Sequence, residues 1–371
     1  MAMPATAERR ARRERIALVD CDVHNAVPSD AALFPYLPAR WRRHVERIGA
    51  RTYSPYAKGF VYPKVSAGGG ARLDSWPPSG ALPGSDLDFM REQLLDPFGV
   101  ETAILNCLYR AAEQRNEEFG AALARAVNDW QIEHWLEPEP RLRASITVTY
   151  ESPDLAAAEI DRVAAHPGFV QVLLFPRTRE PLGRRRYRPI FEAAERNGLP
   201  VGIHFASTTA APITAAGWPS FYIEDHTSMS VAFQAQVASL VFEGTFDRFP
   251  GLRVALVEGG FGWLPPLLWR LDDLYRGRPD ELEHLTRAPS QYVRDHVRLT
   301  TQPVEEPQNP RDVLGLVDDV GPEMLMFSTD YPHWDFDHPD RAFQVRLPDR
   351  TREMIMRENA RAFYDLDRAP A

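Results

Sequence analysis

The chain has 371 residues, and its 43 lysines and arginines against 52 aspartates and glutamates give a formal net charge of −9 at pH 7. A hydrophobic content of 44% predicts a globular protein with a large core, while the net charge and the lack of a basic block argue against nucleic acid as a partner. No run of about 18 apolar residues occurs, and no long apolar segment follows the N-terminal arginines. We therefore expect a cytoplasmic protein with no membrane span and no secretory signal.

Lysine and cysteine are both scarce. The lysines are Lys58 and Lys64, which lie in a segment rich in glycine, proline and serine, so a catalytic lysine on a rigid element is not expected. The cysteines, Cys21 and Cys107, are too few for a disulfide framework and lie in apolar runs. We expect both to be buried thiols.

Short β-branched segments alternate along the chain with longer segments of helical periodicity. In chain order the sequence predicts strand Ile16–His24, strand Glu101–Leu108, helix Asn116–Leu136, strand Arg143–Tyr150, helix Pro153–Ala165, strand Val170–Pro176, helix Arg188–Asn197, strand Leu199–Phe205, helix Ser228–Phe246, strand Leu252–Glu258, helix Trp263–Tyr275, strand His296–Thr301, helix Arg311–Asp318, strand Met324–Asp330 and helix Arg350–Tyr364. This alternation predicts an α/β fold of the (β/α)8 type, a TIM barrel. A doubly wound open sheet is the alternative, and it fits less well because no glycine-rich turn follows the first strand.

A barrel of this kind ordinarily needs about 250 residues, so the length predicts long loop insertions. We expect one barrel domain over residues 16–366, preceded by an N-terminal extension (1–15) and followed by a short tail (367–371). Insertions at 49–88 and 206–225 follow the first and fifth strands and should emerge at the C-terminal face, where such barrels place their chemistry. For the glycine-rich part of the first insertion, a disordered surface loop is the alternative.

The first predicted strand carries three ionisable residues in alternation: Asp20, Asp22 and His24. Side chains alternate between the two faces of a strand, so we expect these three to point into the barrel and the intervening apolar residues to pack against helices. Asp20 should lie about 7 Å deeper in the barrel than Asp22, because a strand rises by about 3.3 Å per residue. This deeper position suits a structural role for Asp20. Alone, Asp22 and His24 are as well explained by a buried hydrogen-bonded pair.

Two further residues favour a metal site over a simple hydrogen-bonded pair. His204 is the last residue but one of the fifth predicted strand, and Asp330 is the last residue of the eighth. The first and eighth strands of a closed barrel are neighbours, and the fifth lies across the mouth. Asp22, His24, His204 and Asp330 should therefore converge. Two imidazoles and two carboxylates suit a divalent ion such as Zn²⁺, Mn²⁺ or Fe²⁺.

Several motifs resemble the amidohydrolase superfamily, and within it the amidohydrolase 2 branch typified by aminocarboxymuconate-semialdehyde decarboxylase. The resemblance covers roughly residues 16–366 and rests on Asp22-Val-His24, the strand-end His204, Phe327-Ser-Thr-Asp330-Tyr-Pro-His333-Trp, Glu258-Gly-Gly-Phe-Gly-Trp-Leu-Pro265 and Glu358-Asn-Ala-Arg-Ala-Phe363. It implies a (β/α)8 barrel with one catalytic divalent metal, Zn²⁺ being the first expectation, held by the four convergent residues. Binuclear members of the superfamily use a lysine on the fourth strand, which is absent from Val170–Pro176, so we predict a single metal.

The chain departs from the branch at two positions. Asp22 stands where the first motif usually has histidine, and Glu258 stands before Gly-Gly where decarboxylating members generally carry histidine. Glu258 can act as a general base, bind a cationic group, or simply pair with an arginine. His226, after the second insertion, can replace the missing relay histidine or cap a helix.

Four residues near the mouth are candidates for substrate binding: Arg110, Trp218, Tyr222 and His333. Arg110 can hold a substrate carboxylate by a bidentate pair or form a loop salt bridge. The aromatic residues of both insertions favour a planar or apolar substrate, but they are equally typical of a dimer contact, and we expect a homodimer. His333 is also compatible with a structural role.

A divalent ion lowers the pKa of a bound water towards 7, and Asp330 beside it can accept and return the proton. We therefore predict a mononuclear metal-dependent hydrolase that acts on a small, aromatic or cyclic substrate. The first alternative is a non-oxidative decarboxylase of an aromatic or unsaturated carboxylic acid, which makes more demand on the missing histidine. The second alternative is a barrel that only binds a ligand.

Overall fold

The structure is a computed structural model that describes residues 17–50, 70–109, 111–112, 114–205 and 212–367. The predicted N-terminal extension, both lysines and Arg110 lie outside the described residues, as do the end of the tail and parts of both insertions. The predicted domain bounds therefore stay a prediction.

Eight parallel strands form one sheet in which each strand pairs with the next in chain order. The strands are β1 (Leu18–Val23), β2 (Val100–Leu105), β3 (Leu142–Thr147), β4 (Phe169–Leu174), β5 (Val201–His204), β6 (Val254–Val257), β7 (Val297–Thr300) and β8 (Leu325–Met326). The chain after β8 returns to β1: the Cys21 N–H donates to the Phe327 carbonyl at 3.0 Å, and the Asp330 N–H donates to the Asp22 carbonyl at 3.0 Å. These bonds close the sheet, so the predicted barrel is confirmed.

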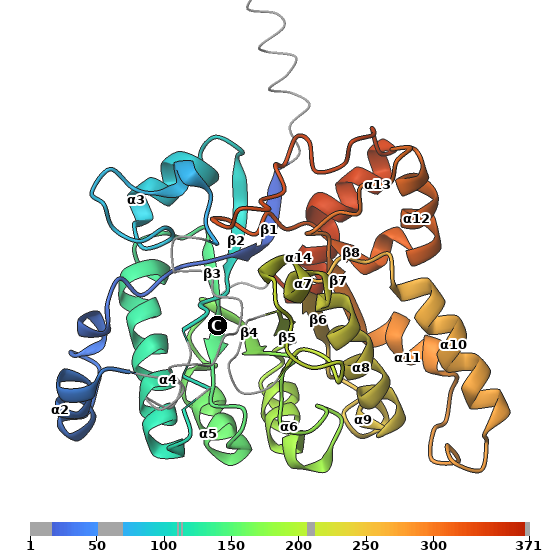
Figure 1. The fold of residues 1–371 in the computed structure, drawn as a ribbon, viewed down its shortest axis with the longest axis horizontal. Coiled ribbons are helices and arrows are strands. Elements are labelled where there is room, and N and C mark those ends of the chain that lie inside the picture. Colours follow the sequence, from blue (N-terminus) through green and yellow to red (C-terminus); the bar gives the residue numbers. More distant parts are fainter. Residues whose placement is uncertain (1–16, 51–69, 110, 113, 206–211, 368–371) are drawn as a thin grey trace, which may run out of the picture.

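Helices surround the strands, as α4, α5, α6 and α8 show in Figure 1. The described helices are α2 (Ala39–Ile48), α3 (Leu87–Met90), α4 (Glu117–Gln131), α5 (Pro153–Val163), α6 (Arg188–Arg196), α7 (Tyr222–Thr227), α8 (Met229–Phe242), α9 (Thr245–Arg248), α10 (Leu264–Gly277), α11 (Pro289–His296), α12 (Asp312–Val320), α13 (Asp349–Glu353) and α14 (Asn359–Tyr364). Turns of π-helix extend α3 over Arg91–Leu95, extend α4 over Ile132–Leu136 and join α13 to α14 over Met354–Glu358.

Local sequence explains most helix ends. The Asn116 side chain accepts the Phe119 N–H at 3.0 Å and caps α4, while Pro153 begins α5. The predicted helix Ser228–Phe246 is instead divided into α8 and α9, because Gly244 adopts a left-handed conformation with φ 67°. The seventh strand begins one residue later than predicted, because His296 ends α11.

A second, smaller hydrophobic cluster fills the barrel interior. It joins Val19 and Cys21 to side chains of β2, β4, β6 and β8, which lie on different sides of the barrel, and to α14. The prediction that Val19 and Cys21 pack against the outer helices is therefore wrong. The pairing of β1 with β2 shifts register between Asp20 and Val23, and this irregularity breaks the simple alternation of faces. Both cysteines are buried thiols, as predicted.

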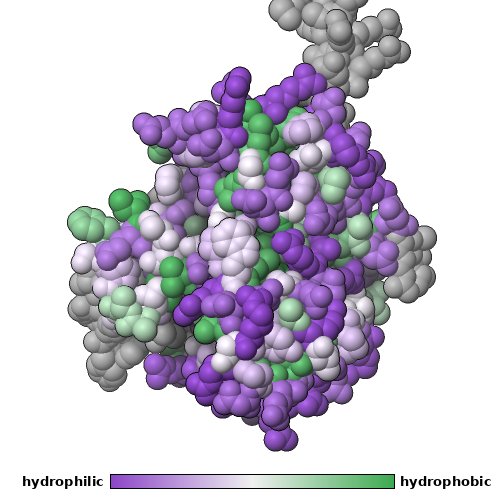
Figure 2. All heavy atoms as spheres, turned by 90° about the vertical axis from the view of Figure 1, so that its right-hand side faces the viewer, coloured by the Kyte–Doolittle hydropathy of each residue, from purple (hydrophilic) through white to green (hydrophobic). Residues whose placement is uncertain are grey.

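The described part of the first insertion packs over the ends of β1 and β8. The Ala26 N–H donates to the Gly84 carbonyl at 2.8 Å, and the Arg72 N–H donates to the Pro332 carbonyl at 2.9 Å. On the side of the molecule shown in Figure 2, hydrophilic residues dominate the outline and apolar residues form smaller groups towards the middle. None of the described helices is both long and apolar enough to cross a membrane. The predicted dimer stays a prediction.

Candidate metal centre

The four predicted metal ligands meet at the C-terminal mouth of the barrel. His204 Nε2 lies 3.1 and 3.2 Å from the two carboxylate oxygens of Asp22. His24 Nε2 lies 2.7 Å from Asp330 Oδ1 and 3.4 Å from Asp22 Oδ1. All four side chains are buried. The strand ends thus bring together residues that are up to about 300 positions apart, as expected for a barrel whose first and eighth strands adjoin.

The orientation of both imidazoles fits a divalent cation. His24 Nδ1 donates to the Asn106 carbonyl at 2.7 Å, and His204 Nδ1 donates to the Phe205 carbonyl. In the neutral imidazoles each Nε2 atom therefore carries a lone pair, and each lone pair faces a carboxylate. Lone pairs held this close repel one another unless a proton or a cation lies between them. Imidazole nitrogens and carboxylate oxygens are suitable donors for Mn²⁺, Fe²⁺ or Zn²⁺, so the residues present fit the ion that the resemblance implies.

Asp20 and Asn106 support the ligands. Asp20 accepts the Thr329 N–H at 2.9 Å and the Thr329 hydroxyl at 2.6 Å, which ties β1 to the chain after β8. Its deeper, structural position agrees with the expectation from the sequence. Asn106 was missed: its side-chain amide donates to Asp22 Oδ1 at 2.8 Å. An asparagine between apolar residues at the end of the second predicted strand was the available signal.

Glu258 and His226 form a second group beside the first. His226 Nε2 lies 2.9 Å from Asp335 Oδ2, and potential ligand atoms of His226, Glu258 and Asp335 all lie within 4.8 Å of one another. Glu258 Oε2 is 3.5 Å from His204 Nδ1, so the two groups adjoin. The structure thus brings together all three predicted catalytic residues, and it adds Asp335, which the sequence analysis missed.

Gln302 links the two groups. Its side-chain amide donates to Asp335 Oδ2 at 2.9 Å and lies 3.3 Å from Asp330 Oδ2. Gln302 directly follows the seventh predicted strand, His296–Thr301, and is fully buried. A polar residue at a strand end was again the only signal in the sequence.

Two of the site carboxylates sit on unusual backbone. Glu258 and Asp330 have φ values of 64° and 61°, in the left-handed region that residues other than glycine seldom adopt. Asp365 is the third such residue in the described parts of the chain. Such conformations cost about 1–3 kcal/mol each and persist where the surroundings enforce them, often at functional sites.

The two carboxylates also have opposite electrostatic surroundings. Burial raises the pKa of Glu258 well above its usual range, and the nearby carboxylates of Asp330, Asp22 and Asp335 raise it further. Burial also acts to raise the pKa of Asp330, but His333 and His24 outweigh it and hold that pKa below its usual range. Paired carboxyl groups whose pKa values are pushed apart are typical of an acid and its partner base.

Two of the predicted substrate-binding residues, His333 and Tyr222, lie beside this centre. His333 Nδ1 lies 2.7 Å from Asp330 Oδ1, and its ring centroid is 4.3 Å from that of His24. Tyr222 accepts the Trp334 indole N–H at 3.3 Å and its ring lies 5.8 Å from that of His226. Trp218 is partly exposed. Their predicted roles stay predictions.

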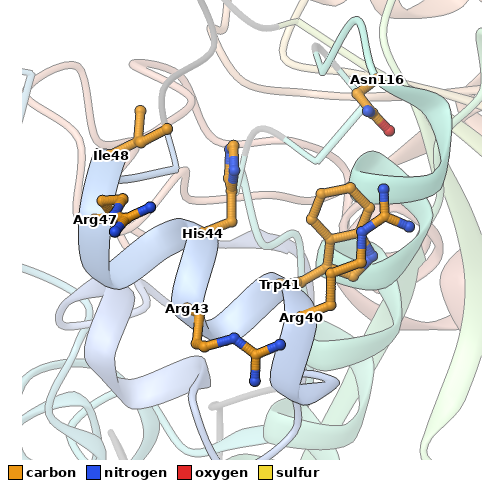
Figure 3. A pocket seen from close by; sticks show the side chains of 7 residues that line it. All are labelled: Arg40, Trp41, Arg43, His44, Arg47, Ile48 and Asn116. Atoms are coloured by element: carbon orange, nitrogen blue, oxygen red, sulfur yellow. The ribbon is translucent and has the colours of Figure 1, made fainter.

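Described residues line two cavities that bear on the position of the site. One of about 460 Å³ lies between α2 and the start of α4, and its lining contains no candidate site residue (Figure 3): Arg40, Trp41, Arg43, His44, Arg47, Ile48 and Asn116. The other, of about 530 Å³, has His226, Gly259 and Trp263 in its wall and so lies beside the second group.

Comparisons with known proteins agree with this site. A family model described as Amidohydrolase matches residues 19–366, nearly the whole chain. A gamma-resorcylate decarboxylase from Rhodococcus jostii is 28% identical over 308 residues, which covers 76% of this chain and 89% of the relative. A gamma-resorcylate decarboxylase from a Rhizobium species is 25% identical over the same shares of both chains.

Solved structures share the fold. The crystal structure of 5-carboxyvanillate decarboxylase from Novosphingobium aromaticivorans, complexed with manganese and a nitrobenzoic acid, has a TM-score of 0.71 and 20% identity, and covers 95% of this chain and 97% of that one. An amidohydrolase from Mycobacterium avium subsp. paratuberculosis has a TM-score of 0.69 and 21% identity, and covers 94% of this chain and 99% of that one.

These relatives overturn the prediction of a hydrolase. The curated relatives that match three quarters of the chain are named as decarboxylases, which break a carbon–carbon bond. The prediction failed because it took the absence of a histidine before Gly259 as evidence against decarboxylation. The family model matches residues 19–366, which form the barrel, and this match shows that the chain belongs to the amidohydrolase 2 family.

Proposed function

We propose that this protein is a divalent-metal-dependent, non-oxidative decarboxylase of a small aromatic carboxylic acid. The observation that carries the proposal is the alignment of three quarters of the chain with several curated gamma-resorcylate decarboxylases. The site supports it, because the buried carboxyl groups of Asp22, Glu258 and Asp330, with the partly buried Asp335 beside them, would repel an anionic acid unless a cation were bound among them.

Asp22, His24, His204 and Asp330 would hold one ion per chain. When bound, the ion would supply a positive charge that offsets the charge of an anionic substrate and of the surrounding carboxylates and so lets the substrate enter. We infer Mn²⁺ rather than the first expectation of Zn²⁺, because a donor set of imidazole and carboxylate suits Mn²⁺ and a solved structure with this fold is described with manganese.

The chain's own residues must then deliver one proton to carbon. The bond between the ring carbon and the carboxylate breaks, CO₂ leaves, and the electron pair that stays on the ring carbon takes the proton. We assign the proton donor to Glu258, which is buried and lies with Asp22 and Asp330 in one group whose oxygens are within 4.8 Å. Glu258 also belongs to the group with His226 and Asp335, and His226 lines the neighbouring cavity and can return a proton from solvent.

The test uses protein stripped with a chelator and reloaded with Mn²⁺ or Zn²⁺. We expect 2,6-dihydroxybenzoate or 5-carboxyvanillate to release CO₂, and in D₂O the ring carbon that lost the carboxylate should carry one deuterium by NMR. His204→Ala should abolish both metal binding and CO₂ release. Binding of the metal without CO₂ release from any aromatic acid would refute the proposal and favour a barrel that only binds ligands.

A matched pair of variants tests the proton donor. Glu258→Gln should keep the metal and lower kcat by about 10²–10⁴-fold, the usual contribution of a positioned acid. The control is Glu159→Gln, which changes another buried glutamate, on α5 and hydrogen-bonded to Arg162, and should leave kcat unchanged. A normal kcat in the Glu258→Gln enzyme would refute the assignment of Glu258 as the proton donor and point to another group.

A further inference from the structure

A chain of buried polar side chains crosses the barrel interior from the C-terminal helix to the candidate metal centre. The Tyr364 hydroxyl on α14 donates to Gln171 Oε1 at 3.0 Å, and Gln171 Nε2 donates to Ser145 Oγ at 2.8 Å and to Asn106 Oδ1 at 3.1 Å. The Ser145 hydroxyl donates to Asn106 Oδ1 at 2.7 Å, and Asn106 Nδ2 donates to Asp22 Oδ1 at 2.8 Å. We refer to Tyr364, Gln171, Ser145 and Asn106 as the interior ladder.

The ladder occupies space that barrels usually fill with branched aliphatic side chains. Its members are fully buried or, for Tyr364, 4% exposed, so each polar group must find a partner inside the protein. The hydrogen bonds that join successive members of the ladder all run in the same direction, towards Asp22, and hydrogen bonds aligned in this way strengthen one another. The ladder therefore ends with a polarised amide N–H on a carboxylate that the proposed metal centre uses.

Asn106 is the member that contacts the ligands. Its side-chain oxygen accepts two hydrogen bonds and its amide nitrogen donates to both Asp22 Oδ1 and the Cys21 carbonyl, so the amide cannot rotate without losing partners. Its backbone N–H donates to the Val23 carbonyl at 2.8 Å, and its carbonyl accepts His24 Nδ1 at 2.7 Å. One residue thus sets both the Asp22 carboxylate and the imidazole tautomer of His24.

We propose that Asn106 is a positioning residue of the metal centre and that Tyr364 on α14 sets Asn106 through Gln171 and Ser145. The C-terminal helix, whose Phe363 and Tyr364 pack in the interior cluster with Val19 and Val170, then contributes to metal affinity across the interior. This inference rests on the proposed metal site, and it does not depend on the reaction catalysed there. It follows from the contacts because ligand carboxylates and imidazoles bind metal best when outer partners hold their orientation.

The experiment titrates chelator-stripped protein with Co²⁺ and records the visible absorption spectrum of the bound ion. Asn106→Ala should raise the Kd for Co²⁺ by about 10–100-fold, the usual effect of losing an outer partner of a ligand. Tyr364→Phe should raise the Kd by a smaller factor and also shift the absorption spectrum, because the ligand geometry changes. If Asn106→Ala does not fold, Ser145→Ala removes one of the two hydrogen bonds to Asn106 Oδ1 and should change the same two readouts.

Tyr292→Phe is the matched control. Tyr292 is also a buried tyrosine, and its hydroxyl donates to Asp247, away from the metal centre. Both tyrosine variants should lower the melting temperature of the metal-free protein, while Tyr292→Phe keeps the wild-type Kd and spectrum. A Tyr364→Phe protein with the wild-type Kd and spectrum would overturn the proposal. Normal Co²⁺ binding without CO₂ release from aromatic acids would refute the proposed reaction and leave this inference standing.

Discussion

Gly202 on β5 should be intolerant of even one added carbon atom. A Cβ at this position would lie 2.3 Å from Gln171 Cδ, 2.4 Å from Nε2 and 2.6 Å from Oε1, far inside van der Waals contact. The amide is the movable end of Gln171, but it is fully buried and held by hydrogen bonds to Tyr364, Ser145 and Asn106. Gly202→Ala must therefore displace the amide and break those bonds.

The expected loss follows from these contacts. Overpacking a buried site costs about 1–3 kcal/mol, and each of the three hydrogen bonds contributes about 1 kcal/mol. The lower entropy of the unfolded alanine chain returns about 0.4–1 kcal/mol. We therefore expect Gly202→Ala to lower the free energy of unfolding by about 3–6 kcal/mol.

The assay is urea unfolding of metal-free protein, followed by tryptophan fluorescence. Gly315→Ala in α12 is the control, because a Cβ there meets no atom within 4 Å, and it should be neutral or stabilise by up to about 1 kcal/mol. The cause is tested in a Gln171→Ala background, where the clash is gone and Gly202→Ala should cost less than about 1 kcal/mol. An equal loss in both backgrounds would refute the reasoning.

Three further predictions concern stability and metal binding. Asp225→Ala should cost about 3–5 kcal/mol in urea unfolding, because it removes the carboxylate that pairs with the Arg177 guanidinium at 2.5 Å where both side chains are 1% exposed; a loss below about 1 kcal/mol would contradict this. Burial raises the pKa of Asp337 from 3.8 to about 7, so the folded protein binds a proton that the unfolded chain releases, and stability should fall as the pH rises from about 4 to about 7. Asp337→Asn should flatten this part of the melting-temperature profile, and an unchanged slope would assign it to other groups. Mn²⁺ at about 100 times its Kd should stabilise the wild type by about 2.7 kcal/mol in thermal unfolding and should not stabilise His204→Ala; equal gains in both would place the ion elsewhere.

The barrel and the convergence of the candidate ligands could be predicted because they depend on local patterns. Strand ends are marked by where a β-branched run stops, and His204 and Asp330 stand at those ends. Parallel strands in a closed barrel direct their C-terminal ends to one mouth, so position in a strand was enough to bring these residues together with Asp22. Helix ends were predictable for the same reason, as at the Asn116 cap.

The supporting residues could not be predicted, since their partners are distant in sequence. Asn106 contacts residues 82 and 84 positions before it and 39 and 65 positions after it, and an isolated amide in an apolar run carries no sign of such partners. The assumption of regular alternation failed at Cys21, because a register shift depends on how β1 meets β2 rather than on either segment alone.

The sequence by itself therefore determined the order of the strands, the set of candidate ligand residues and the mouth at which they gather, because these depend on periodicity and position. Only the tertiary structure decided how the site is charged and oriented. The left-handed backbone of Glu258 and Asp330 and the imidazole tautomers set by backbone carbonyls depend on groups from other strands. The opposite pKa shifts of the two carboxyl groups likewise arise from burial and from neighbouring charges that the fold brings together. Electrostatic and hydrogen-bonding effects act through space, so they exist only once the chain has closed into a barrel.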